Sequence, residues 1–212
     1  MKRTIQTVGA FGILFSLCAI PPAAAQDETG WRLKLHGVAA QSTAGSDTAF
    51  GGGVSLEYRA SRRLGFEISA LTAEIEDEMS FDFFGEEVLS IESALRMTPV
   101  LAKLNLHLTP GRRADLYLGP VVGRMMYSDL DVKVRSSLDD ETFTGHAKTG
   151  DDWTWGAHVG VDVPVGDRGF FFNAGATWLK AEVEIEGDPE DGGDFSSNLD
   201  PLVAQIGFGY RF

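Results

Sequence analysis

The chain of 212 residues has a single cysteine, Cys18, and little positive charge. One cysteine cannot form an internal disulfide. Eighteen Lys and Arg face 31 Asp and Glu, which gives a formal net charge of -13 at pH 7. Because nucleic-acid binding depends on cations that neutralise phosphates, we expect no nucleic-acid partner. Beyond the first 25 residues no apolar run approaches the length of about 20 residues that a transmembrane helix needs, so we expect no such helix.

The first 25 residues have the pattern of a secretory signal peptide. Lys2 and Arg3 precede an uncharged, largely apolar run over residues 8–20, and Ala23-Ala24-Ala25 closes it. A short basic region, an apolar core and a small-residue ending define a cleavable signal. The sequence therefore predicts residues 1–25 as signal peptide, cleaved after Ala25, and residues 26–212 as one mature domain.

Apolar side chains alternate with polar or small ones along eight segments of the mature chain. In the clearest segment, Val100, Ala102 and Leu104 alternate with Leu101, Lys103 and Asn105. A period of two sustained over about ten residues predicts a β-strand. The segments are residues 31–41, 50–60, 64–75, 100–108, 115–127, 153–165, 169–186 and 202–212. The segment 115–127 is apolar on both faces, and the alternation does not assign its facing.

The connections between these segments also alternate, in length. Residues 61–63, 109–113 and 166–168 are short and rich in turn residues, whereas 42–49, 76–98, 128–152 and 187–200 are longer. Short turns on one side and long loops on the other are typical of outer-membrane barrels, whose short turns face the periplasm. Residues 81–91 are unusually apolar for a loop; they could cap the barrel, rest on the outer leaflet or extend the strands as a hairpin.

Three features favour an apolar face that points to lipid rather than to a soluble core. The other face combines Gly and Ser with charged residues, which suits a narrow barrel interior. Aromatic residues lie near the segment ends, as in interfacial girdles. Phe208, Tyr210 and Phe212 share one face of the last segment, an ending that resembles the signal read by the barrel assembly machinery. We therefore predict an eight-stranded antiparallel transmembrane β-barrel in the outer membrane, surrounded by its lipids and lipopolysaccharide; the alternative is a soluble, lipocalin-like barrel.

The chain ends in LDPLV at residues 199–203 followed by IGFGYRF at 206–212, and it also contains WRL at 31–33, PVL at 99–101 and LYLGPVVG at 116–123. These motifs, and the ending most strongly, resemble those of the OmpW family of small outer-membrane proteins. The resemblance implies an eight-stranded barrel with a hydrophobic interior channel that passes small apolar compounds. The short first loop and the acidic third loop depart from the family pattern, so no ligand residue is carried over.

The inward-facing residues divide by depth into two groups. Residues of both charge signs lie near the short turns, and we predict that they pair into a plug at the periplasmic end: Arg32, Lys34, Glu57, Arg59, Glu67, Lys103, His107, Asp162 and Arg211. Small and apolar residues lie toward the long loops, where we predict a cavity: Val38, Ala40, Leu71, Leu101, Thr154, Leu179 and Val203.

These groups predict a barrel that binds or passes small hydrophobic molecules through the outer-half cavity. The alternative is a structural or adhesion barrel that acts through its extracellular loops without transport. The four histidines, His36, His107, His146 and His158, have no nucleophile motif beside them. We therefore predict no enzyme activity, cofactor or metal site. The acidic loops could bind cations that bridge lipopolysaccharide, although solvated loop charge is the simpler interpretation.

Overall fold

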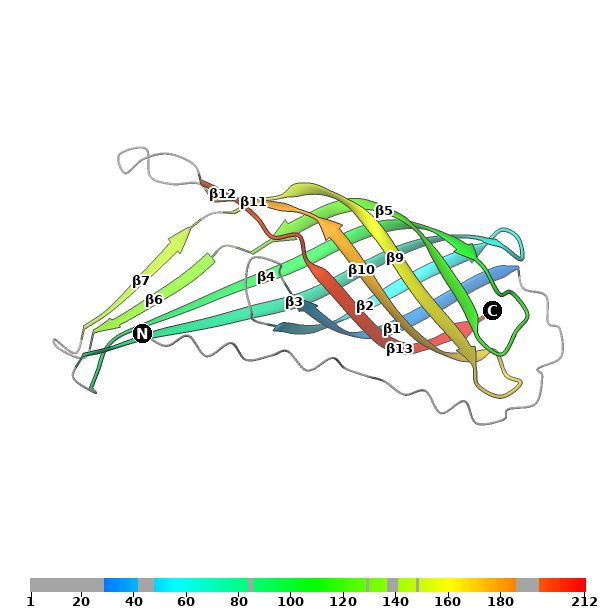
Figure 1. Ribbon diagram of the computed structural model, residues 1–212, viewed down its shortest axis with the longest axis horizontal. Coiled ribbons are helices and arrows are strands. Elements are labelled where there is room, and N and C mark those ends of the chain that lie inside the picture. Colours follow the sequence, from blue (N-terminus) through cyan, green and yellow to red (C-terminus); the bar gives the residue numbers. More distant parts are fainter. Residues whose placement is uncertain are drawn as a thin grey trace, which may run out of the picture.

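The computed structural model describes residues 29–41, 48–83, 86–128, 130–136, 141–147, 149–185 and 195–212. All regular elements within these ranges are β-strands (Figure 1). In the same ranges, no helix is long and apolar enough to cross a membrane. The predicted signal peptide, residues 1–25, lies outside the described residues.

Eight strands form a closed barrel. They are β1 (Gly30–Gln41), β2 (Thr48–Arg59), β3 (Leu64–Phe83), β4 (Glu86–His107), β5 (Asp115–Tyr127), β9 (Asp152–Pro164), β10 (Phe170–Lys180) and β13 (Leu202–Arg211). Their order is β3-β2-β1-β13-β10-β9-β5-β4, and the pairing of β3 with β4 closes the ring. All pairs are antiparallel. The predicted eight-stranded antiparallel barrel is confirmed.

The barrel has two different ends. The short connections 60–63, 108–114 and 165–169 lie at one end, together with the start of β1 and the end of β13; we call this the turn end (Figure 1). Gly169 in the third connection has a φ of +83°, a conformation open to glycine at little cost. The opposite end, which we call the loop end, carries the long connections.

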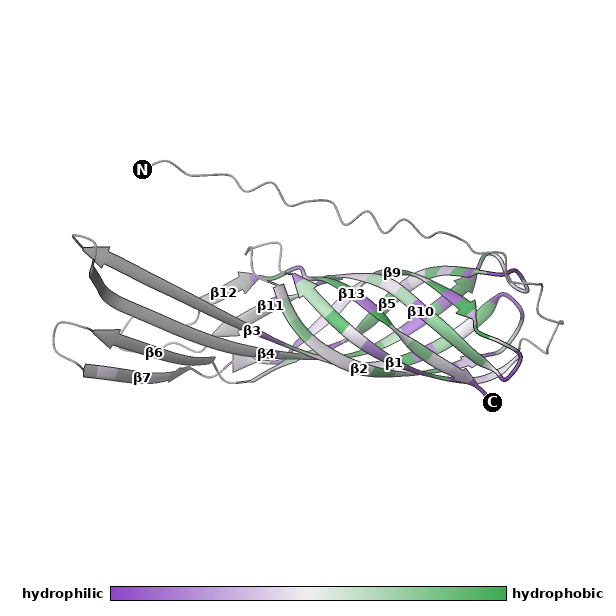
Figure 2. Cartoon of the chain, turned by 90° about the horizontal axis from the view of Figure 1, so that it is seen from below, coloured by the Kyte–Doolittle hydropathy of each residue, from purple (hydrophilic) through white to green (hydrophobic). Residues whose placement is uncertain are grey.

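The prediction that residues 76–98 form a loop is wrong. The strand β3 runs 20 residues and β4 runs 22 residues, and they pair from Leu64 with Leu106 to Phe83 with Glu86. Of the three interpretations of residues 81–91, the extended hairpin is confirmed. Because the hairpin continues well past the other barrel strands, it projects from the loop end (Figure 1). Along the barrel strands themselves, hydrophobic and hydrophilic residues alternate (Figure 2).

The long connections beyond this hairpin also contain strands. Within residues 128–152, β6 (Leu130–Ser136) pairs with β4, and β7 (Glu141–Ala147) pairs with β6. A small second sheet has the order β12-β11-β8, from Phe195–Asn198, Glu182–Ile185 and Thr149–Gly150. The expected single strand over residues 169–186 is therefore wrong, since β10 ends at Lys180 and β11 joins a different sheet.

The apolar face of the barrel points outward. Leu35, Ile68 and Phe208 are 62%, 65% and 67% exposed, whereas Lys34 and Glu67, which directly precede the first two in the chain, are 0% and 3% exposed. In β5, Tyr117, Val121 and Met125 point inward, and Leu116, Leu118 and Val122 point outward, which assigns the facing that alternation left open. Exposed aromatic pairs lie near both ends, with Trp31 4.9 Å from Tyr58 and Trp155 6.0 Å from Trp178 between ring centroids.

Candidate functional site

The half of the barrel interior near the turn end is filled by ionisable side chains. We call this set the charge network; each member is at most 6% exposed, and the members are Arg32, Lys34, Glu57, Arg59, Glu67, Lys103, His107, Asp115 and Asp162. Apart from His107, the set has four cations and four carboxylates. Such groups are tolerated away from water only when they are paired and hydrogen-bonded.

Glu67 and Lys34 lie at the centre of the charge network. The Glu67 carboxylate accepts bonds from Lys34 Nζ at 2.7 Å and from Lys103 Nζ at 3.0 Å. Lys34 Nζ also lies 2.9 Å from Glu57 Oε2. Asn105 Nδ2 donates to Glu57 Oε1 at 3.1 Å and to Glu67 Oε2 at 3.2 Å, which joins the two carboxylates through one amide. Four strands, β1 to β4, thus meet in one cluster.

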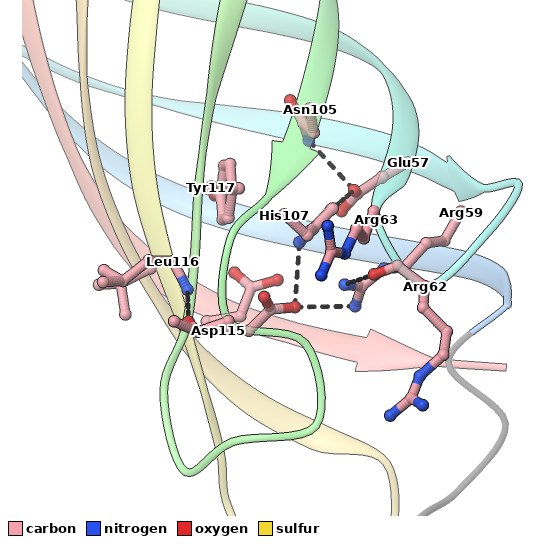
Figure 3. Close-up of polar contacts among 12 residues, drawn as sticks. Glu57, Arg59, Arg62, Arg63, Asn105, His107, Asp115, Leu116 and Tyr117 are labelled. Atoms are coloured by element: carbon pink, nitrogen blue, oxygen red, sulfur yellow. Dashed lines mark hydrogen bonds and ion pairs between the residues drawn. The ribbon is translucent and has the colours of Figure 1, made fainter.

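His107 extends the network to the turn end (Figure 3). Its Nε2 lies 2.9 Å from Glu57 Oε1 and its Nδ1 lies 3.0 Å from Asp115 Oδ2. Arg59 NH1 lies 2.8 Å from the same Asp115 oxygen. Because both ring nitrogens face carboxylates, a doubly protonated imidazolium would donate to both.

Further contacts span the lumen. Arg32 on β1 donates to Asp162 on β9 at 3.3 Å, although β13 and β10 lie between these strands in the sheet. Asn173 Nδ2 donates to Asp162 Oδ1 at 2.6 Å and to the Tyr117 hydroxyl at 2.8 Å. Contacts between strands that are not neighbours require side chains to meet across the interior, so the charge network spans the lower lumen.

Aromatic rings pack beside the charge network, in space that glycines leave free. Lys34 Nζ lies 4.8 Å from the centre of the Tyr117 ring, within range of a cation–π interaction. Gly160 leaves the space that the ring occupies, because a Cβ at this position would overlap it. Gly209 does the same for the buried ring of Phe171.

Eight of the nine residues predicted for the plug take part in the ion pairs and hydrogen bonds of the charge network. The ninth, Arg211, is half-buried at the end of β13, opposite Arg32 in the strand register. Sequence reasoning missed Asp115, which lies in the one segment whose facing was unassigned. Asn105 and Asn173 were placed on the polar face but not in the network, since uncharged amides carry no pairing signal.

The half of the interior near the loop end is apolar. All seven residues predicted to line a cavity are at most 5% exposed. Val38, Ala40, Leu71 and Val203 line a pocket together with Thr72, Ala73, Met97, Pro99, Met125 and Pro201. Leu101 and Leu179 are buried in the same apolar cluster without lining that pocket. The Thr154 hydroxyl donates to the carbonyl of Lys180 at 2.8 Å, which satisfies its polar group.

The pocket is small and open on one side. The enclosed cavity has a volume of only about 10 Å³, room for about one water molecule and far below the range of about 300–1,000 Å³ usual for small-molecule sites. Two of its lining residues, Met97 and Met125, have flexible thioether side chains that adapt to irregular shapes.

The barrel wall is irregular beside this pocket. Strands β3 and β4 pair at Ala70 with Val100, and the next pair toward the loop end is Ala73 with Met97. Two residues on each strand between these pairs are unpaired with the other strand. Pro99 lies inside this interval and lines the pocket. Proline has no N–H to donate to a neighbouring strand, so the wall is weakened here; we call this interval the β3–β4 seam.

Two histidines outside the charge network make hydrogen bonds of their own. His36 Nε2 lies 2.9 Å from Ser55 Oγ, and His158 Nε2 lies 2.6 Å from Asn105 Oδ1. His146 lies among residues whose side chains are not described. Within the described part of the chain, no group of three or more His, Cys, Asp or Glu side chains is arranged to hold a metal ion.

Comparison with known proteins gives a consistent answer at the level of the fold. The family model "Outer membrane protein beta-barrel domain" matches residues 11–212. The outer membrane protein OprG from Pseudomonas aeruginosa is similar in structure, with a TM-score of 0.59, 16% identity, and coverage of 88% of this chain and 97% of that chain.

Two other solved structures are also similar. Neisserial surface protein A gives a TM-score of 0.53 at 14% identity, covering 86% of this chain and 96% of that chain. The outer membrane protein AlkL, solved in lipid bilayers, gives 0.51 at 15% identity, covering 92% and 95%. No curated protein matches the sequence.

Proposed function

The chain belongs to the outer membrane protein beta-barrel domain family and lies in the outer membrane among its lipids and lipopolysaccharide, and we propose that it binds small hydrophobic molecules and passes them into the bilayer. Short turns of outer-membrane barrels face the periplasm, so in our proposal the turn end faces the periplasm and the loop end faces outward. The narrower resemblance to the OmpW family agrees with this proposal.

The observation that carries the proposal is the apolar pocket above the charge network. A hydrophobic solute that enters from the loop end leaves water and contacts Val38, Leu71 and Val203, a transfer worth about 25 cal/mol per Å² of apolar surface. Continuing downward would require it to separate ion pairs such as Lys34 with Glu67, buried at 0% and 2% exposure. Breaking a buried pair costs about 3–5 kcal/mol, so this route is unfavourable.

The β3–β4 seam supports a sideways exit instead. Pro99 and Thr72 line the pocket where pairing between the two strands is interrupted. Opening the wall at this point breaks fewer backbone hydrogen bonds than opening a continuous ladder, and the solute then enters hydrocarbon, where it is soluble. The charge network serves as the floor that directs the solute outward.

Delivery to the membrane forms part of the same proposal. Residues 1–25 would export the chain and be cleaved. Phe208, Tyr210 and Phe212 are 67%, 38% and 71% exposed on the outer face of the final strand. We propose that this ending, including Phe212, is read by the barrel assembly machinery.

The transport proposal is tested by filling the pocket. Ala40 lines the pocket and is 1% exposed, so Ala40→Trp should block it. Ala39, the preceding residue, points to the lipid side of β1, so Ala39→Trp is the matched control. Uptake of radiolabelled octane or a monoterpene is measured in cells lacking the protein and complemented with each variant, and folding is checked by heat-dependent electrophoretic mobility.

We expect Ala40→Trp to reduce uptake to the level of cells without the protein and Ala39→Trp to leave it unchanged. If Ala40→Trp does not fold, Leu71→Ala, which enlarges the pocket, should raise uptake. Equal uptake with and without the protein would refute transport. A steady ionic conductance in planar bilayers would refute the closed floor.

A second function is favoured by the projecting sheet of β3, β4, β6 and β7. These four strands pair in the order β3-β4-β6-β7 beyond the loop end, which presents an extended surface outside the cell for adhesion. Deleting residues 75–95 and 130–147 separates the two functions. Loss of cell attachment with retained uptake would indicate adhesion through this sheet, and loss of uptake alone would favour transport.

A further inference from the structure

The three short connections at the turn end all carry exposed arginines. They are Arg62 and Arg63, Arg112 and Arg113, and Arg168; we call these five residues the arginine collar. A concentration of positive charge is unexpected in a chain with a net charge of -13. The collar also lies at the end that faces the periplasm, far from the acidic connections of the loop end.

The collar is continuous around one side of the barrel. The strands joined by these connections follow one another in the order β2, β3, β4, β5, β9 and β10, so the three connections are consecutive around the rim. The first connection is also tied to the end of β4, directly before the second connection, because the backbone N–H of His107 donates to the carbonyl of Arg63 at 2.9 Å. The positively charged connections are therefore neighbours around the rim.

Asp115, which follows the second of these connections, is already engaged inside the barrel. Asp115 accepts from Arg59 and faces His107, and Arg59 in turn donates to the carbonyl of Arg62 at 2.7 Å, which fixes that connection. Figure 3 shows the Arg62 side chain directed away from the Arg59–Asp115 pair. Among the residues that the structure describes, Arg63, Arg112, Arg113 and Arg168 form no ion pair. Asp167 is the one acidic residue within the three connections.

The outer surface next to the collar is apolar. Phe66 on β3, Leu106 and Leu108 at the end of β4, and Leu116 on β5 are 52%, 45%, 51% and 45% exposed. In the chain, these residues lie within a few positions of the arginines in the adjoining connections. Cationic turns beside a hydrocarbon-facing surface match an amphiphile with an anionic head and apolar chains, whereas a soluble polyanion would leave the apolar part without a partner.

From this arrangement we propose that the arginine collar binds anionic phospholipids of the leaflet that faces the periplasm, with their phosphates on the guanidinium groups and their acyl chains against the apolar residues above. Arginine suits this role because its planar group donates two hydrogen bonds to one phosphate. Binding on one side of the barrel would give the protein a preferred annulus of anionic lipid, independent of any solute in the pocket.

Trp31 provides a local probe of this site. It is 50% exposed and lies at the turn end against Tyr58, whereas Trp153, Trp155 and Trp178 lie toward the loop end. The variant Trp153→Phe, Trp155→Phe, Trp178→Phe leaves Trp31 as the only tryptophan of the chain. The full chain is reconstituted in phosphatidylethanolamine vesicles that contain a quarter of phosphatidylglycerol, and either lipid carries brominated chains that quench tryptophan fluorescence.

We expect brominated phosphatidylglycerol to quench Trp31 as if it were enriched about fivefold at the site, the factor expected for one effective cation–headgroup contact. Replacing Arg62, Arg63, Arg112 and Arg113 by Gln should abolish the enrichment, and replacing them by Lys should retain part of it. High salt should weaken it, since exposed charges are screened.

Three results would overturn the proposal. Quenching in proportion to the mole fraction of each lipid would show that no selectivity exists. Enrichment that persists in the four-fold Gln variant would place the lipid site elsewhere. Binding of soluble peptidoglycan fragments that competes with phosphatidylglycerol and is lost in the Gln variant would identify a glycan rather than a lipid as the partner.

Discussion

Replacing Glu67 by Gln should strongly destabilise the barrel. The Glu67 side chain is 2% exposed and accepts from two lysines, Lys34 at 2.7 Å and Lys103 at 3.0 Å. Glutamine keeps the size of the side chain and removes its charge. Lys34 then retains Glu57 at 2.9 Å, whereas Lys103 loses the ion pair that the structure records for it.

The size of the effect follows from these distances. A contact between unit charges at about 3 Å is worth roughly 5 kcal/mol at an effective dielectric constant near 20. Part of this loss is offset, because burying the amide of Gln costs less desolvation free energy than burying the carboxylate of Glu67. Removing one partner of a buried pair typically costs about 3–5 kcal/mol, since the other charge is left unpaired. We expect Glu67→Gln to lower the free energy of unfolding by this amount.

The assay is urea unfolding of the purified barrel in phospholipid vesicles, followed by fluorescence of its lipid-facing tryptophans. The matched control is Glu74→Gln on the same strand, whose partner Arg96 lies at a similar 2.9 Å but whose pair is 58% and 42% exposed. An exposed pair contributes about 0.2–1 kcal/mol. Equal losses for the two variants would refute the reasoning, because they would show that water solvates the charge network.

Three further predictions concern the same interior and its rim. Gly160→Ala should cost about 1–3 kcal/mol, because its Cβ would overlap the Tyr117 ring; urea unfolding measures this loss. Tyr117→Phe should cost about 1 kcal/mol in the same assay, because the hydroxyl that accepts from Asn173 at 2.8 Å is lost. A hydrogen bond from Lys180 holds the pKa of Asp200 below its ordinary value, so the protection of the amides of residues 199, 200 and 202 against hydrogen exchange, taken relative to the intrinsic rate at each pH, should stay constant from neutral pH to about pH 4 and fall as the pH drops through that lowered pKa.

Each of these predictions has a built-in comparison. A Cβ on Gly145 in β7 would meet nothing within 4 Å, so Gly145→Ala should be nearly neutral. Tyr127→Phe removes a hydroxyl whose contact with the Glu182 carbonyl is long, at 3.5 Å, and should cost less than Tyr117→Phe. Asp200→Asn should make this protection, relative to the intrinsic exchange rate, independent of pH in the acidic range.

The membrane-spanning part of the fold could be predicted from the sequence because lipid and lumen impose opposite demands on alternate residues. Leu104 and Lys103 are neighbours in the chain, yet one is 36% exposed and the other 4%. A period of two is the direct result. The alternation identified the inward face. The distance of each inward residue from the short turns then separated the charged residues of the lower interior from the apolar ones above.

The projecting hairpin could not be predicted in the same way. Residues 76–96 extend past the last pairs with the neighbouring strands β2 and β5, so we expect no hydrocarbon to select one face there, and the alternation fades. The strands continue because they pair with each other across the hairpin, with one irregularity at Phe81 and Asp82. Met97, which lines the pocket, was consequently assigned to a loop, and Pro99 was left outside the predicted strand 100–108.

Which residues pair with each other within the charge network could not be predicted from the sequence either. Arg32 pairs with Asp162 across the lumen although Glu57 is its register neighbour on β2. This choice depends on how far each side chain reaches across a closed ring of eight strands, which alternation does not encode.

The two halves of the interior are linked through the narrowness of the barrel. Arg32 can reach Asp162 at 3.3 Å only because eight strands enclose a small diameter, and the same diameter leaves an enclosed cavity of only about 10 Å³ above. In the proposed transport, a solute would therefore have to displace side chains such as Met97 and Met125. Since the floor beneath them is held by ion pairs and pairing between β3 and β4 is interrupted at Pro99, the displacement that costs least would be toward the β3–β4 seam.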